Sequence, residues 1–138
     1  KYQRKVSGPI IDRIDIWLEV GQISHEKLSD KDGAGAKSET IRARVIRARE
    51  IQAKRFAGKK YKTNSEMNAR DIQKFVPLDL ETKKILNASA TKLDLSARAY
   101  HRVIKLARTI ADLAESEHVT SKHLLEAIQY RPKQEKNI

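Results

Sequence analysis

Only one stretch of the chain alternates apolar and polar residues with the period of a β-strand. In residues 14–20, four aliphatic side chains alternate with Asp15, Trp17 and Glu19, which predicts a strand. A strand needs a partner for its backbone hydrogen bonds, and no second alternating run follows. The chain therefore cannot build a sheet from its own sequence. We expect a mainly α fold preceded by one unpaired core strand and a flexible loop.

Helical signals fill the rest of the chain. Apolar spacing predicts helices over residues 39–57, 65–75, 80–92, 97–115 and 121–130. Asp79, Ser96 and Thr120 stand where N-caps of the last three belong, and Val76-Pro77 should end the second. The helix over 97–115 is apolar on more than one face, so we expect it to lie at the centre of a bundle.

The charge is concentrated in one segment. The 138 residues carry a formal net charge of +11, and residues 37–62 hold ten basic residues against two acidic ones. The basic side chains on the predicted helix 39–57 are candidates for contacts with nucleic-acid phosphates: Arg42, Arg44, Arg47, Arg49, Lys54 and Arg55. The alternative is a solvated surface whose arginine stems cover the edge of the core. Aromatic residues are absent among them, so base stacking has little support.

Several classes of site are excluded or disfavoured. The chain has no Cys, which excludes disulfides, thiolate zinc sites and a cysteine nucleophile. Its four His show no ligand spacing, and we expect no metal site. Residues 30–39 resemble part of a calcium-binding loop, but Leu28 would occupy the first ligand position, so a solvated loop is preferred. No apolar run could span a membrane, and we expect a cytoplasmic protein.

Four segments carry a family resemblance. They are residues 7–15 (SGPIIDRID), the pair 41–45 and 48–52, residues 95–102 (LSARAYHR) and residues 107–113 (ARTIADL). In this order they resemble the C-terminal part of the magnesium-chelatase-like AAA+ ATPases of the ComM type, from about Tyr2 to Arg131. Because the chain begins at Lys1 without Met or a leader, we expect a piece of a larger protein.

The resemblance implies a domain organisation and two functional residues. Residues 1–36 would be the end of the AAA+ α/β core, poorly ordered without the rest of it, 37–131 the helical lid, and 132–138 a disordered tail. Arg13 would be the arginine finger, and Arg98 the second sensor that binds an ATP phosphate. The whole protein would bind ATP and Mg²⁺ and form a hexameric ring. This chain lacks the phosphate loop and the magnesium-binding acid, so alone it should bind no cofactor and be inactive.

Three functions remain open from the sequence. The resemblance implies ATP hydrolysis coupled to remodelling or translocation of DNA. A second hypothesis keeps the ATPase but couples it to metal insertion into a porphyrin, as in magnesium chelatase. A third is a stand-alone basic helical module that binds nucleic acid without nucleotide chemistry.

Overall fold

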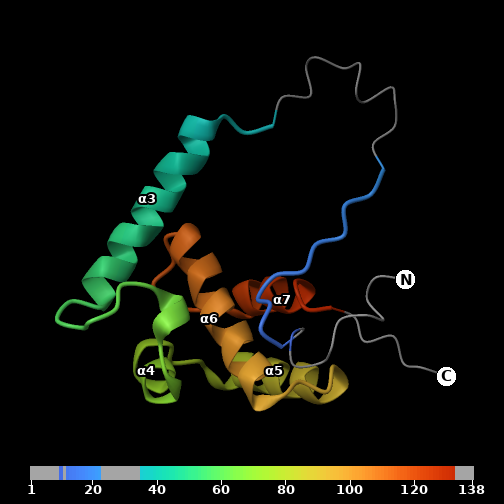
Figure 1. Cartoon of the computed structure of the whole chain (residues 1–138). Helices are drawn as coiled ribbons and strands as arrows, with labels where there is room; N and C mark the ends of the chain where they lie inside the picture. The colour runs from blue at the N-terminus through green and yellow to red at the C-terminus, as the bar shows by residue number, and fades with distance from the viewer. Residues whose placement is uncertain (1–9, 11, 23–34, 133–138) are drawn as a thin grey trace.

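The computed structural model describes residue 10, residues 12–22 and residues 35–132. Within these ranges the chain forms helices and no strand (Figure 1), which confirms the mainly α prediction. The elements are α3 (Ser38–Arg55), the 3₁₀ helix η2 (Asn64–Glu66), α4 (Ala69–Phe75), α5 (Leu80–Lys92), α6 (Ala97–Leu113) and α7 (Ser121–Gln129). The central helix is α6, which packs against α3, η2, α4 and α7, while α5 packs against α7.

The N-caps decide where the last three helices begin. The Asp79 carboxylate accepts a hydrogen bond from the Thr82 N–H at 2.6 Å, and the Ser96 hydroxyl accepts one from the Ala99 N–H at 3.1 Å. The backbone N–H of Thr120 donates to His123 Nδ1 at 3.1 Å. Each bond gives a partner to a backbone N–H at the helix start that has no acceptor within the helix. The predicted starts of α5, α6 and α7 are confirmed.

The helix predicted over residues 65–75 is wrong as a single element. The chain makes the short turn η2 and then restarts at α4, because Asn68 forms a new N-cap. Its side chain accepts from the Asp71 N–H at 3.0 Å, and the Asp71 carboxylate accepts from the Asn68 N–H at 3.3 Å. This reciprocal pair, a capping box, favours a helix start at residue 69 over a continuous helix.

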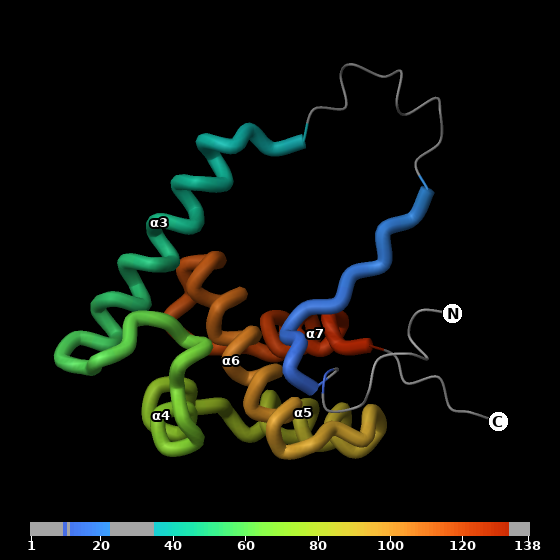
Figure 2. Tube along the Cα trace, viewed as in Figure 1, coloured from blue at the N-terminus to red at the C-terminus, as the bar shows by residue number. Residues whose placement is uncertain are grey.

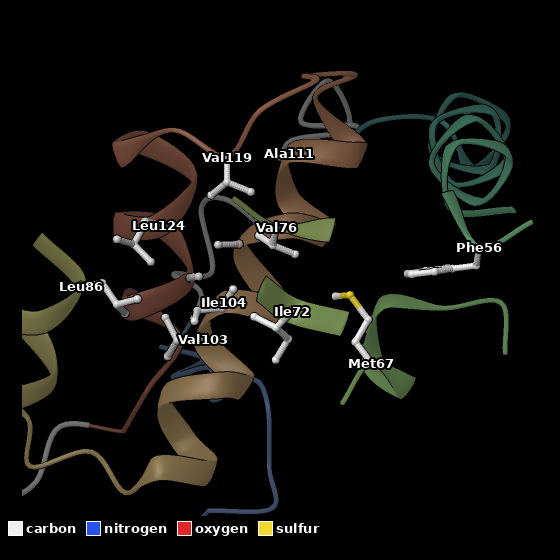
Figure 3. Close-up of a cluster of buried hydrophobic side chains, with 12 residues drawn as sticks. Phe56, Met67, Ile72, Val76, Leu86, Val103, Ile104, Ala111, Val119 and Leu124 are labelled. Carbon is white, nitrogen blue, oxygen red and sulfur yellow. The ribbon is translucent and has the colours of Figure 1, made fainter. Parts of the chain in front are cut away.

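The core lies between α6 and the helices around it (Figure 3). Phe56 and Met67 fill the end nearest α3, and Leu86, Val103 and Leu124 fill the end nearest α5 and α7. All five side chains are at most 2% exposed. Burying a side chain of this size contributes about 1.5–3 kcal/mol, so these contacts supply much of the driving force for folding.

Only the second half of α3 joins this core. Ala48, Gln52 and Phe56 are buried, but Ile41 and Val45, which continue the same stripe, are 50% and 45% exposed. The first turns of α3 extend past the end of α6 (Figure 1), and no other element in the described ranges covers them. The stripe predicted from the sequence is therefore real, but this part of it lacks a partner.

The strand expected over residues 14–20 is not formed. This segment has no regular secondary structure, because no second strand offers it a hydrogen-bonding edge. Instead, the Trp17 N–H donates to the Tyr130 carbonyl at 2.9 Å, and Arg131 Nη1 donates to the Ile14 carbonyl at 2.8 Å. Residues 1–9, 11, 23–34 and 133–138, and the expectations that fall on them, lie outside the described residues.

A buried carboxylate attaches α3 to the bundle. The Asp112 side chain is fully buried and accepts hydrogen bonds from Arg55 at 2.5 and 2.8 Å, from Arg108 Nε at 3.0 Å and from Asn64 Nδ2 at 2.8 Å. Arg55 ends α3, Asn64 begins η2, and Arg108 and Asp112 lie on α6. Burial raises the pKa of Asp112, but the hydrogen bonds from Arg55 and Asn64 lower it more, so the carboxylate stays charged.

Replacing this carboxylate should therefore be costly. Asp112→Asn removes the negative charge between two guanidinium groups and leaves buried donors without acceptors, which should lower the free energy of unfolding by about 3–5 kcal/mol. The control Glu50→Gln changes an exposed carboxylate on α3 and should cost about 0.5 kcal/mol or less. Urea unfolding followed by circular dichroism measures both, and a loss for Asp112→Asn as small as that of the control would contradict this account of the network.

The cap of α5 should make stability depend on acidity. Hydrogen bonds from the backbone N–H and then the side chain of Thr82 hold the pKa of Asp79 below its usual 3.8. A pKa lowered by folding stabilises the protein above the unfolded value, and this contribution is lost as the pH falls through the folded value. Asp79→Asn keeps a good cap without the charge. Between about pH 6 and about pH 2 the wild type should therefore lose more unfolding free energy than Asp79→Asn, whereas parallel losses would exclude this role.

Candidate functional site

The segment that carries Arg13 lies against the start of α6 and the end of α7 (Figure 2). Ser96, the N-cap of α6, donates from its hydroxyl to the Asp12 carboxylate at 2.8 Å. Arg102 of α6 forms an ion pair with Asp15 at 2.5 Å. Together with the bonds at Ile14 and Trp17, these contacts attach residues 12–17 to the bundle. Part of the segment expected to be poorly ordered is thus hydrogen-bonded to the lid.

Arg13 itself is exposed. Its backbone N–H donates to the Ile10 carbonyl at 2.9 Å and closes a turn, but within the described ranges its side chain has no hydrogen bond or ion pair. Its neighbours Asp12 and Ile14 are both bonded to the bundle. The backbone is therefore held on each side of Arg13, and its exposed guanidinium group has no partner among the described residues.

Arg98 lies in the first turn of α6, two residues after Ser96. The bond between Asp12 and Ser96 thus brings the two segments that carry Arg13 and Arg98 side by side. The first turn of α6 contains no acidic residue. A cation there opposes the positive end of the helix dipole, and a bound anion would relieve that repulsion.

A pocket of about 380 Å³ adjoins Arg98, between α6 and α4. Three further basic or titratable side chains of α6 line it: His101, Arg102 and Lys105. They follow Arg98 at three, four and seven residues and so share its helix face. Sequence reasoning missed them, although this spacing was the signal that could have found them. No carboxylate lines this pocket, which makes it suited to an anion.

The charges in this pocket repel one another. Burial lowers the pKa of Lys105, and the nearby positive charge of Arg102 lowers it further. Lys105 Nζ donates to the Ser65 carbonyl at 2.9 Å, a neutral acceptor that does not cancel its charge. The Asp15 carboxylate partly raises that pKa again. The pocket retains an excess of positive charge that phosphate oxygens could offset.

The structure separates the basic residues of α3 into two groups. Four of them are exposed with no ion pair in the described part of the chain: Arg42, Arg44, Arg49 and Lys54. Arg47 pairs with Glu115 at 2.8 Å across two exposed side chains. Arg55 has a different role, because both of its terminal nitrogens bind Asp112. We therefore exclude Arg55 from the nucleic-acid candidates.

Two further properties concern the described ranges alone. No group of three or more His, Asp or Glu side chains there is arranged to hold a metal ion. Among the helices there, none combines the length and apolar character that a transmembrane segment requires. Of residues 30–39, which resemble part of a calcium-binding loop and for which a solvated loop is preferred, residues 30–34 lie outside the described residues, and Glu39 lies in the first turn of α3.

Comparison with known proteins agrees with the motifs. The family model described as magnesium chelatase, subunit ChlI C-terminal, matches residues 35–131. The competence protein ComM of Haemophilus influenzae is 37% identical over 131 residues, which are 95% of this chain and 25% of the relative. The protein YifB of Escherichia coli is 38% identical over 131 residues, again 95% of this chain and 25% of the relative. The chain thus spans about a quarter of the length of these relatives. It belongs to the magnesium chelatase ChlI C-terminal family, in its ComM-like branch.

Proposed function

We propose that this chain is the lid region of a ring-forming AAA+ ATPase that couples ATP hydrolysis to remodelling or translocation of DNA. The family match and the relative named for competence support this proposal. The observation that carries it is the Asp12–Ser96 hydrogen bond, which holds the segment of Arg13 beside the helix turn of Arg98. Two exposed arginines, one on each of two adjoining segments, suit the binding of phosphate oxygens.

Arg13 has the properties that an arginine finger needs. A guanidinium group stays charged at neutral pH, and its planar fork can hold two oxygens of a phosphoryl group. As the γ-phosphoryl is transferred, negative charge develops on these oxygens, and a fixed cation stabilises the transition state more than bound ATP. The exposed side chain of Arg13, on a backbone held at both neighbours, could reach the nucleotide of an adjacent subunit in a hexameric ring.

Arg98 and the pocket beside it fit the phosphates of a bound nucleotide. Arg98 would contact a phosphate from the first turn of α6, and the positive charge of Lys105 would attract the anion, while Arg102 is paired with Asp15. ATP supplies the phosphoryl group, and Mg²⁺, held by residues outside this chain, supplies charge neutralisation. The chain itself would sense the nucleotide, since it contains no phosphate loop.

The exposed basic faces of α3 would contact DNA. Arg42 and Arg49 are seven residues apart and share one face of the helix, while Arg44, Arg47 and Lys54 lie on another. Both groups flank the buried face of Ala48 and Gln52. Cations on two sides of a projecting helix could neutralise phosphates without reading bases.

Two other functions have specific support. The matching family is that of magnesium chelatase, which favours metal insertion into a porphyrin as the work coupled to ATP hydrolysis. The uncovered basic end of α3 would also suit a module that binds nucleic acid without nucleotide chemistry. The chelatase function predicts a rate of ATP hydrolysis that DNA does not change, and the stand-alone module predicts no ATP hydrolysis.

The deciding experiment measures ATPase activity of the whole protein with and without DNA. We expect duplex or single-stranded DNA to increase kcat severalfold at low salt. Replacing Arg42, Arg44 and Arg49 with Gln should raise the DNA concentration needed for half-maximal stimulation, because phosphate contacts are lost. A rate that DNA does not change would exclude the DNA-coupled function and favour the chelatase function, while the absence of any ATPase activity would favour the stand-alone module.

The role of Arg13 can be tested in the same protein. Arg13→Ala should lower kcat by about 10³–10⁵ and change nucleotide affinity much less, because a finger acts on the transition state. Arg13→Lys should restore little, since a point charge lacks the bidentate fork. Arg70→Gln, an exposed arginine of α4, is the matched control and should keep the wild-type rate.

If the arginine finger acts on the nucleotide of the neighbouring subunit, mixed rings provide a further test. Mixed rings of Arg13→Ala subunits and subunits with a replaced phosphate-loop lysine should regain some activity, because some interfaces then combine an intact finger with an intact nucleotide site. If co-assembled mixed rings stay inactive, Arg13 does not act across the interface.

A further inference from the structure

Arg131 is a buried cation that neither the pocket nor the Asp112 network uses. It follows the end of α7, and its side chain is only 4% exposed. Nη1 donates to the Ile14 carbonyl at 2.8 Å, and Nη2 lies 3.9 Å from the Asp12 carboxylate. Burial lowers its pKa, while the charges of Asp12 and Asp15 raise it. One guanidinium group thus contacts the residue before Arg13 and the residue after it.

The other contacts of this segment are more exposed. The Arg102–Asp15 ion pair joins side chains that are 28% and 48% exposed, and Ser96 and Asp12 meet at the surface. Water competes with such contacts, so each contributes little on its own. A charged hydrogen bond that is shielded from water is stronger. Arg131 is therefore the contact that most firmly defines where the backbone of Arg13 lies.

We propose that Arg131 is a positioning residue for Arg13, which it fixes to the helical bundle so that both move as one body. This inference rests on the proposed role of Arg13 as an arginine finger. Arg131 itself stays buried and touches no nucleotide. A movement of the lid would then move the finger with it, and loosening Arg131 would misplace the finger without changing its chemistry.

Trp17 reports this attachment independently of ATP hydrolysis. It is the only Trp in the chain, and its side chain is half-buried. Its backbone N–H donates to the carbonyl of Tyr130, the residue before Arg131. In the 138-residue chain, Arg131→Gln should speed hydrogen exchange at the Trp17 amide about tenfold or more and shift Trp17 fluorescence to longer wavelength. Exchange at Val103 and Ala107 of α6 should stay slow, and Arg131→Lys should give an intermediate rate.

A second variant loosens the docked segment from the opposite side, at Asp12, which faces Arg131 and Ser96, and at Asp15, which pairs with Arg102. Asp12→Ala combined with Asp15→Ala changes only the docked segment, so the core of the bundle remains intact, and Trp17 exchange should again increase. The matched control is Arg70→Gln. If Trp17 exchange in Arg131→Gln and in the double variant equals that of the control, the attachment does not depend on Arg131 and the proposal is overturned.

The functional consequence is measured in the whole protein. Arg131→Gln should lower kcat at least tenfold with little change in the KM for ATP, as for a misplaced finger, and Arg131→Lys should recover part of the loss. Faster Trp17 exchange with a wild-type kcat would overturn the positioning role. Full turnover in Arg13→Ala would instead overturn the function proposed for Arg13, while the Trp17 measurement would still test the attachment by Arg131.

Discussion

The arrangement of this chain depends on one buried carboxylate. Asp112 sits near the C-terminal end of α6 and is bonded by the last residue of α3, the first residue of η2 and Arg108 of its own helix. A charge buried this deeply is tolerated only when it is fully paired, and this requires all three elements to meet. Because the exposed first half of α3 has no support of its own in the described ranges, its direction follows from this attachment and from the packing of Ala48, Gln52 and Phe56.

The second attachment lies at the opposite end of the bundle, and there the buried charge is positive instead of negative. Here a buried cation, Arg131, pairs with the carboxylate of Asp12 and the carbonyl of Ile14. The two attachments place one candidate function at each end of α6: basic residues for DNA on α3, and Arg13 beside Arg98 near the start of α6. One continuous helix, α6, connects the two attachments.

Local sequence signals predicted the helices well. Side chains at Asp79 and Ser96 bond to the first turn of their own helices, so nearby residues determine those boundaries. The predicted end of α5 at residue 92 is confirmed, whereas α6 ends at Leu113 and not at residue 115. Each helix is followed two residues later by a residue with a positive φ that is not glycine, Asp94 at 48° and Glu115 at 54°. The Asn68 cap was overlooked, although both members of its capping box are visible in the sequence.

The sequence by itself determined the helical class, the position of most helices, the family and the two arginines of its motifs. Only the tertiary structure decided which charges are available to a ligand. Arg42 and Arg55 look equivalent on one basic helix. However, Arg42 is exposed, whereas Arg55 is bonded to Asp112, 57 residues away. Residues 14–20 alternate as a strand does, yet residues 14, 15 and 17 bond to the helical bundle, at Arg131, Arg102 and Tyr130 respectively. Caps and periodicity act between near neighbours, whereas the pairing of a buried charge depends on residues that only folding brings together.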